Sequence, residues 1–73
     1  MARLKLYGRR HCHLCEEMAQ ALRARGVAFD EIDVDASAEL KNRYGLIVPV
    51  LADAAGKELC RTRLDGAVLQ QIT

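Results

Sequence analysis

Two cysteines separated by two residues are the part of this sequence best suited to chemistry. Cys12 and Cys15 lie where a strand-like segment gives way to a helix-like one. In that context a C-x-x-C motif is typical of thiol–disulfide exchange. The free N–H groups and positive dipole end of a helix start favour an anion, so we expect Cys12 to be the thiolate nucleophile. Residues three apart on a helical turn have neighbouring β-carbons, which predicts Cys15 as the resolving thiol.

Basic and protonatable side chains crowd around Cys12 in the sequence. We expect Arg10, His11 and His13 to favour the charged form of this thiol and so to make it more acidic. The two glutamates that follow the motif are expected to disfavour the thiolate form of Cys12. We expect the basic groups to outweigh them, so that the Cys12 thiol is more acidic overall. The histidines are interpreted as solvent-facing electrostatic groups, because a thiolate needs no separate general base.

Short strand-like and helix-like segments alternate along the chain and must position this motif. The pattern predicts a β-α-β-α-β-β-α order whose first two strands are parallel, with a right-handed crossover. The predicted strands are 3–7 with one face packed, 27–34, 46–51 and 57–61, with a turn at 53–56. The first predicted helix begins near Leu14 and stops at Gly26, and the second spans Ala38–Tyr44 after a Ser37 cap. The third follows an Asp65 cap, and its apolar face contains Leu64, Val68, Leu69 and Ile72.

Length, composition and charge limit the classes of protein. The 73 residues predict one domain, 1–73, since there is no room for a second core. Eleven basic and ten acidic side chains give a net charge of +1, which argues against a nucleic-acid binder. The longest apolar run, 46–52, is too short to cross a membrane, and the N-terminus does not resemble a signal peptide. We therefore expect a cytoplasmic monomer without a membrane partner.

Three segments carry a resemblance to a known family. They are Tyr-Gly-Arg-Arg-His-Cys-His-Leu-Cys at 7–15, Asp-Val-Asp at 33–35 and Ile-Val-Pro at 47–49. Together they resemble the glutaredoxin-like branch of the thioredoxin superfamily over nearly the whole chain. The resemblance implies a thioredoxin-like, glutaredoxin-type three-layer α/β/α sandwich with a four-stranded mixed sheet. The first and third helices would cover one face of the sheet, and the short second helix the other.

The same resemblance implies residues that bind substrate. Val48 and Pro49 stand where the family carries a cis peptide bond facing the cysteines, which would present the backbone of Val48 to an extended thiol substrate. Arg9 stands where glutaredoxins often carry a lysine that contacts the glutathione carboxylate. The alternative for Arg9 is an ordinary solvated charge. The implied function is a small thiol–disulfide oxidoreductase that acts on protein or low-molecular-weight disulfides and holds no resident cofactor.

Two departures from the family pattern bear on the reductant. Family members usually have proline and an aromatic residue between the cysteines, where this chain has His13 and Leu14. A histidine there is expected to stabilise the thiolate and make the disulfide a stronger oxidant. The glycine pair and aspartate that hold the other end of glutathione are missing, and 61–65 stands in their place. Glutathione and a thioredoxin-reductase-type donor therefore both remain as candidate reductants.

Other interpretations of the cysteines stay open. A C-x-x-C motif can be half of a zinc site. However, the histidines adjacent to the cysteines in the sequence do not easily converge with them on one ion, and no second pair of ligands follows in the sequence. We therefore assign no metal ligand. The alternative function is a non-catalytic module of the same fold that binds zinc, an iron–sulfur cluster or a protein through these cysteines. Arsenate-reductase-like chemistry is a third class, for which the chain is short. Cys60 is interpreted as a small core residue, or else as a regulatory or dimer-forming thiol.

Overall fold

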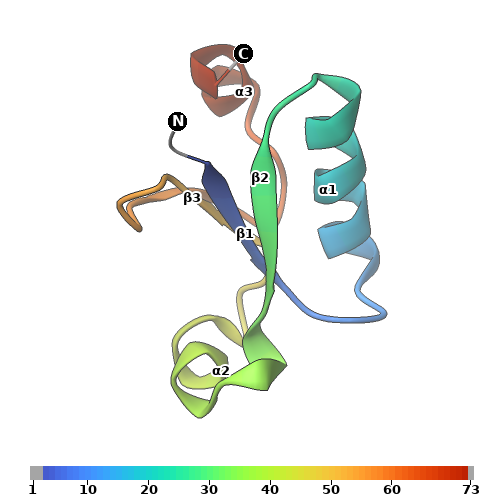
Figure 1. The fold of residues 1–73 in the computed structure, drawn as a ribbon. Coiled ribbons are helices and arrows are strands. Elements are labelled where there is room, and N and C mark those ends of the chain that lie inside the picture. Colours follow the sequence, from blue (N-terminus) through green and yellow to red (C-terminus); the bar gives the residue numbers. More distant parts are fainter. Residues whose placement is uncertain (1–2, 73) are drawn as a thin grey trace.

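A four-stranded mixed sheet organises the protein (Figure 1). The computed structural model describes residues 3–72. The strands lie in the order β2-β1-β3-β4, with β1 parallel to β2 and antiparallel to β3, and with β3 antiparallel to β4. The elements are β1 (Leu4–Gly8), α1 (His13–Ala24), β2 (Phe29–Asp33), the 3₁₀ turn η1 (Val34–Ala36), α2 (Ala38–Tyr44), β3 (Val50–Ala52), β4 (Glu58–Arg61) and α3 (Gly66–Ile72). This confirms the expected element order.

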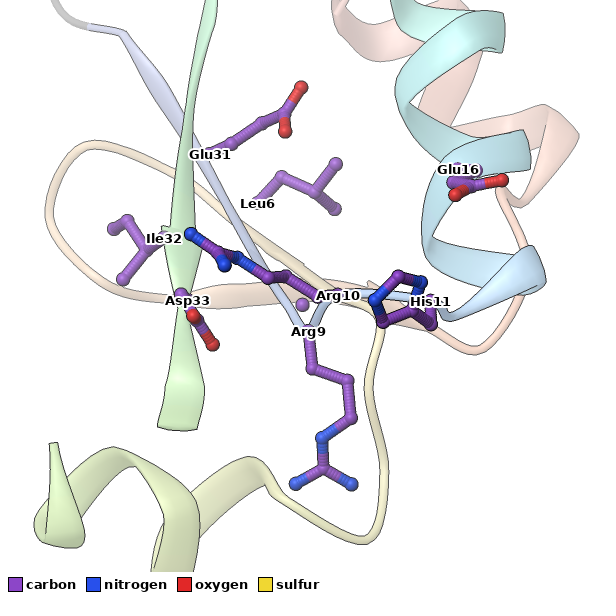
Figure 2. Close-up of a pocket in the computed structure, with 9 residues that line it drawn as sticks. Leu6, Arg9, Arg10, His11, Glu16, Glu31, Ile32 and Asp33 are labelled. Carbon is purple, nitrogen blue, oxygen red and sulfur yellow. The ribbon is translucent and has the colours of Figure 1, made fainter. Parts of the chain in front are cut away.

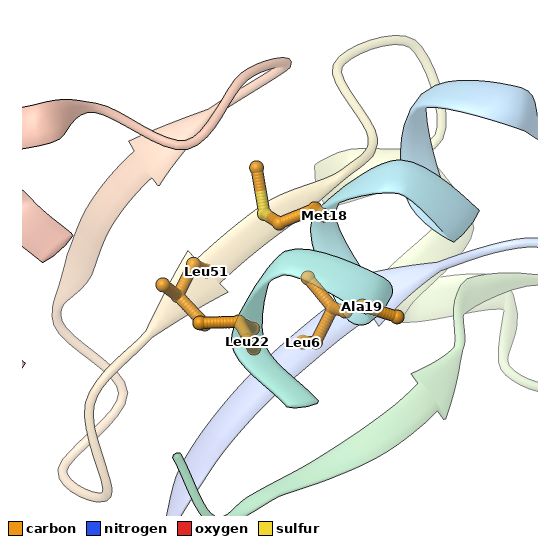
Figure 3. Close-up of a cluster of buried hydrophobic side chains, with 5 residues drawn as sticks. All are labelled: Leu6, Met18, Ala19, Leu22 and Leu51. Carbon is orange, nitrogen blue, oxygen red and sulfur yellow. The ribbon is translucent and has the colours of Figure 1, made fainter. Parts of the chain in front are cut away.

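Two apolar clusters divide the core between the faces of the sheet. On one face, the side chains of Met18, Ala19 and Leu22 from α1 pack against Leu6 and Leu51 (Figure 3). Val68 and Ile72 of α3 pack against the same cluster. On the other face, a second cluster contains Tyr7, Val34, Tyr44, Val50 and Ala52, and Leu40 of α2 packs against it. Helices α1 and α3 thus share one face and α2 covers the other, which is the expected three-layer sandwich.

Local capping sets the limits of α1, the helix that carries the cysteines. Cys12 is its N-cap, with extended backbone angles. At the other end Gly26 adopts the left-handed conformation, with φ of 69°. Its N–H donates to the Arg23 carbonyl, and that of Val27 donates to the Leu22 carbonyl, both at 3.0 Å. These two bonds form a Schellman motif, so glycine stops the helix as the sequence predicts.

The remaining helices also begin at predicted caps. The Ser37 hydroxyl accepts a hydrogen bond from the Leu40 N–H at 3.4 Å at the start of α2. The Asp65 carboxylate accepts one from the Ala67 N–H at 2.7 Å in the first turn of α3. Helix α2 is tied to the sheet by its last residue, because the Tyr44 ring stacks on that of Tyr7 with ring centroids 4.5 Å apart. Such aromatic contacts add to the stabilisation from burial.

Three strand predictions need correction. Strand β1 packs on both faces, with Leu6 in one cluster and Tyr7 in the other, because it is a central strand. Strand β2 is shorter than 27–34, since Val27 belongs to the helix stop and Val34 opens η1. The 46–51 strand is wrong at its start: Ile47 donates to the Tyr44 carbonyl in a turn, and Leu46 is fully exposed. Pairing in β3 begins only after Pro49, which has no N–H to donate.

The predicted hairpin turn joins β3 to β4. The Asp53 carboxylate accepts hydrogen bonds from the N–H groups of Ala55 and Lys57, at 3.0 and 2.9 Å. Gly56 follows in the left-handed region with φ of 93°. The turn thus combines an aspartate that bonds to nearby backbone and a glycine that accepts positive φ, which are the residues such turns require.

Candidate functional site

The cysteine pair lies at the start of α1, as predicted. The Cys12 sulfur accepts a hydrogen bond from the backbone N–H of Cys15 at 3.2 Å. Cys12 is half-buried, whereas Cys15 is only 7% exposed, and the cysteines are free thiols. One sulfur is therefore accessible and held by a backbone donor of the first helical turn, and its neighbour is covered. An N–H donor at this position stabilises negative charge on the accepting sulfur.

Cys15 packs against the end of β1. A β-carbon added to Gly8 would lie 3.1 Å from the Cys15 sulfur and 3.3 Å from its β-carbon. Burial, and then the hydrogen bond with Cys12, raise the pKa of the Cys15 thiol from 9.0 to about 11, although the nearby Arg9 opposes this change. Cys15 therefore holds its proton at neutral pH. Gly8 is a site residue that sequence reasoning missed, because a strand-ending glycine gives no sign of what packs on it.

The loop before Cys12 has a strained backbone and lines a crevice. His11 has a φ of 59°, a left-handed conformation that is unusual for a residue with a side chain. A crevice of about 350 Å³ opens between this loop and β2, and Arg10 and His11 line it (Figure 2). No hydrogen bond or ion pair joins Arg10, His11 or His13 to Cys12 within residues 3–72. Their tuning of the thiol stays a prediction.

Arg9 also lines that crevice, and its guanidinium extends toward α2 (Figure 2). Its guanidinium donates to both carboxylate oxygens of Asp35, at 3.0 and 3.2 Å. The same guanidinium would lie 3.3 Å from a β-carbon added to Gly45. Arg9 thus connects the loop before Cys12 to η1 and the end of α2. No local sequence signal indicates this pair, and a contact between Arg9 and substrate stays a prediction.

The segment around Pro49 is held by the connection between β4 and α3. The Val48–Pro49 peptide bond is cis, as the resemblance implies. The Pro49 carbonyl accepts a hydrogen bond from the Thr62 N–H at 2.7 Å. No hydrogen bond joins the backbone N–H or carbonyl of Val48 to another residue in 3–72. The backbone of Val48 therefore has the free groups that strand addition would need.

Thr62 has an unusual backbone conformation. Its φ is 68°, and the N–H of Arg63 donates to the Arg61 carbonyl at 2.7 Å across it. A hydrogen bond spanning one central residue with positive φ is the mark of a rare, strained γ-turn. Threonine is β-branched and disfavours this conformation, so no sequence signal predicts it.

Cys60 belongs to the core side of β4. It pairs with Leu51 in the β3–β4 register and packs as a partly buried residue against the cluster that contains Met18 and Leu22. Burial raises the pKa of the Cys60 thiol. These observations support its interpretation as a small core residue.

Two further features of residues 3–72 bear on the alternatives. No three or more His, Cys, Asp or Glu side chains in this range are grouped so that they could hold a metal ion. No helix there combines the length and apolar character that crossing a membrane requires.

Known proteins resemble this chain over almost its whole length. The family described as Glutaredoxin-like domain (DUF836) matches residues 3–72. The X-ray structure of protein XcR50 from X. campestris is 43% identical, with a TM-score of 0.78 over 93% of this chain and 91% of that chain. The solution structure of Ne2328 from Nitrosomonas europaea is 39% identical, with a TM-score of 0.83 over 96% and 88% of the two chains.

A more distant structure adds information on the fold alone. A mutant of the thioredoxin-like protein BC3987 is 23% identical, with a TM-score of 0.68 over 96% of this chain and 97% of that chain. It supports the thioredoxin-like fold. Curated proteins give no significant match to this sequence.

Proposed function

Because the chain belongs to the glutaredoxin-like domain family, we propose that it is a thiol–disulfide oxidoreductase whose dithiol is formed by Cys12 and Cys15. The observation that carries this proposal is the position of the Cys12 sulfur at the N-cap of α1, where the Cys15 N–H bonds to it at 3.2 Å. A thiolate is the nucleophile in disulfide exchange, and a helix N-terminus stabilises one.

In the first step, the Cys12 thiolate attacks one sulfur of the substrate disulfide. A new sulfur–sulfur bond joins Cys12 to one half of the substrate, the original disulfide bond breaks, and the other half leaves as a thiolate that takes a proton. Cys12 is suited to this role because it is the more accessible sulfur of the pair.

In the second step, Cys15 attacks the sulfur of Cys12. The Cys12–Cys15 disulfide forms, and the second half of the substrate leaves with the proton that Cys15 gives up, so two electrons pass from the dithiol to the substrate. With a pKa of about 11, on the order of one Cys15 in ten thousand is ionised at pH 7. Two of the causes of that high pKa, the hydrogen bond and the charge of Cys12, disappear once Cys12 is part of a disulfide. Forming the mixed disulfide therefore lowers the pKa of Cys15 and prepares it to react.

Substrate binding completes the proposal. The backbone of Val48, next to Pro49, accepts an extended thiol substrate as an added strand, and Arg9 contacts it only if its pair with Asp35 opens. An external thiol system, either glutathione or a thioredoxin-reductase-type donor, regenerates the dithiol.

The test compares three serine variants in the reduction of 2-hydroxyethyl disulfide. Cys12→Ser should lose all activity. Cys15→Ser should stop at a stable mixed disulfide on Cys12 that mass spectrometry detects. Cys60→Ser is the matched control, since it removes a thiol outside the pair, and should retain activity. Activity that survives in Cys12→Ser would remove the proposal.

A further inference from the structure

Two backbone donors of the connection between β4 and α3 are bonded within the protein. The Thr62 N–H bonds to the Pro49 carbonyl, and the Arg63 N–H bonds to the Arg61 carbonyl, both at 2.7 Å. The carboxylate of a small substrate could accept hydrogen bonds from these two N–H groups only if their existing backbone hydrogen bonds were broken. These two donors therefore offer little to a small anionic thiol.

The guanidinium of Arg9, in the loop before Cys12, is also occupied. The Arg9 guanidinium makes two hydrogen bonds to Asp35, a geometry that fits a carboxylate with both of its oxygens. A substrate carboxylate would have to compete with Asp35 for the same donors. Neither the N–H groups of Thr62 and Arg63 nor the Arg9 guanidinium is thus free to bind a compact, multiply charged disulfide.

On the side of the motif away from the crevice that Arg10 and His11 line, a second hollow has a largely apolar lining. A groove of about 230 Å³ lies between α1 and the β4–α3 connection, and we name it the α1–α3 groove. Its apolar lining comes from Leu14, Met18, Ala21 and Leu64. Leu14 stands between the two cysteines, so the groove begins at the motif. Its other wall includes Thr62, whose N–H is bonded to Pro49.

Charges at the two walls of the groove restrict what fits. Arg63 lies on the β4–α3 connection and Glu17 on α1, and neither has an ion-pair partner within residues 3–72. An acidic group is attracted to the Arg63 wall and repelled from the Glu17 wall. A peptide whose apolar side chain fills the groove therefore gains most if the acidic residue that follows faces the Arg63 wall.

We propose that the substrate of this site is a disulfide carried by an extended polypeptide, with an apolar residue beside its cysteine that fills the α1–α3 groove and an acidic residue that faces Arg63. Glutathione disulfide, which has no apolar side chain, is a poor substrate. This inference rests on the proposed function and names the substrate class of the same site. Exchange then proceeds as above: the peptide disulfide takes two electrons and two protons, and Cys12 and Cys15 become a disulfide.

The test measures how fast the reduced full-length protein is oxidised by five disulfides, with acid quenching and mass spectrometry. Three are homodimers of the amidated peptides Glu-Leu-Cys-Leu-Glu, Lys-Leu-Cys-Leu-Lys and Glu-Ser-Cys-Ser-Glu, whose flanks read alike in both directions. The others are glutathione disulfide and 2-hydroxyethyl disulfide, and the last provides the reference rate for each variant. We expect the first peptide to react on the order of tenfold faster than the serine peptide and glutathione disulfide.

Two pairs of variants locate the effect. Arg63→Glu should reverse the preference between the glutamate and lysine peptides, whereas Lys57→Glu, the same charge change at an exposed site outside the groove, should not. Ala21→Arg should fill the groove and remove the advantage of leucine over serine. Gln20→Arg adds the same side chain to an exposed neighbouring position of α1 and should leave that advantage intact.

The outcomes separate the two proposals. Glutathione disulfide reacting as fast as the leucine peptide, or an Arg63→Glu variant with unchanged charge preference, overturns the substrate class and leaves the oxidoreductase standing. If 2-hydroxyethyl disulfide and every other disulfide fail to react, the proposed function fails, and this inference fails with it.

Discussion

The sulfur of Cys15 lies against the α-carbon of Gly8. A β-carbon at Gly8 would come within 3.1 Å of that sulfur, which is closer than side chains normally pack. The end of β1 therefore fixes the position of the proposed resolving thiol. Because Cys15 is buried and Cys12 is not, the two sulfurs of one motif have different environments and suit different steps.

Gly8→Ala tests this contact. The added methyl group should displace Cys15, lower the free energy of unfolding by about 1 to 2 kcal/mol and slow closure of the disulfide more than formation of the mixed disulfide. Urea unfolding and quenched-flow mass spectrometry measure the two effects. Gly66→Ala is the matched control, since a β-carbon there meets no atom within 4 Å, and it should change stability by less than about 0.5 kcal/mol. Equal effects of the two substitutions would refute the contact.

Alkaline pH should destabilise the reduced protein through Cys15. Its pKa is raised to about 11 in the folded protein, whereas the unfolded thiol ionises near 9.0, so the folded form binds the proton more tightly. The resulting stability is fully present below pH 9 and is lost as the pH rises toward 11. Urea unfolding in reductant at several pH values should show a smaller loss over this range in Cys15→Ser than in the unmodified protein. Parallel curves for the two proteins would contradict the assignment.

The Arg9–Asp35 pair should stabilise the fold modestly. Both side chains are partly exposed, so solvent and salt screen the interaction. A double-mutant cycle with Arg9→Ala and Asp35→Ala should give a coupling energy of about 0.2 to 1 kcal/mol that shrinks at high salt. Urea unfolding at low and high sodium chloride measures it. A coupling energy of zero at low salt would show that the pair does not hold the loop to η1.

The left-handed backbone of Thr62 should cost stability. Glycine adopts positive φ freely, so Thr62→Gly should raise the free energy of unfolding by about 1 kcal/mol even after the entropy cost of glycine. Arg63→Gly is the control: it places glycine at the next residue, which lacks positive φ, and should destabilise the protein. Thermal unfolding distinguishes the two, and a destabilising Thr62→Gly would show that the threonine conformation is not strained.

Elements with local signals could be predicted from the sequence. The α1 stop at Gly26 and the caps at Ser37 and Asp65 depend on residues within a few positions of each other, and all three appear in the structure. The position of the Cys12–Cys15 pair at the start of α1 follows from the same kind of signal.

Features set by distant parts of the chain could not be predicted. The apolar composition of the segment predicts that Leu46 belongs to a strand, but the turn after α2 exposes this residue completely. An apolar run before a proline is compatible with both a strand and an exposed turn. Arg9 and Asp35 are far apart in the sequence and meet only because β1 lies beside β2. The role of Gly8 likewise appears only once α1 is packed on the sheet.

A redox titration of the purified protein in buffers of varied dithiol-to-disulfide ratio, with the cysteine pairing mapped by mass spectrometry, tests whether Cys12 and Cys15 form the redox-active pair. We expect one reversible two-electron transition between free thiols and a Cys12–Cys15 disulfide, present in Cys60→Ser and absent in Cys12→Ser and Cys15→Ser. A transition that persists in Cys12→Ser, or a disulfide that maps to Cys60, would contradict it.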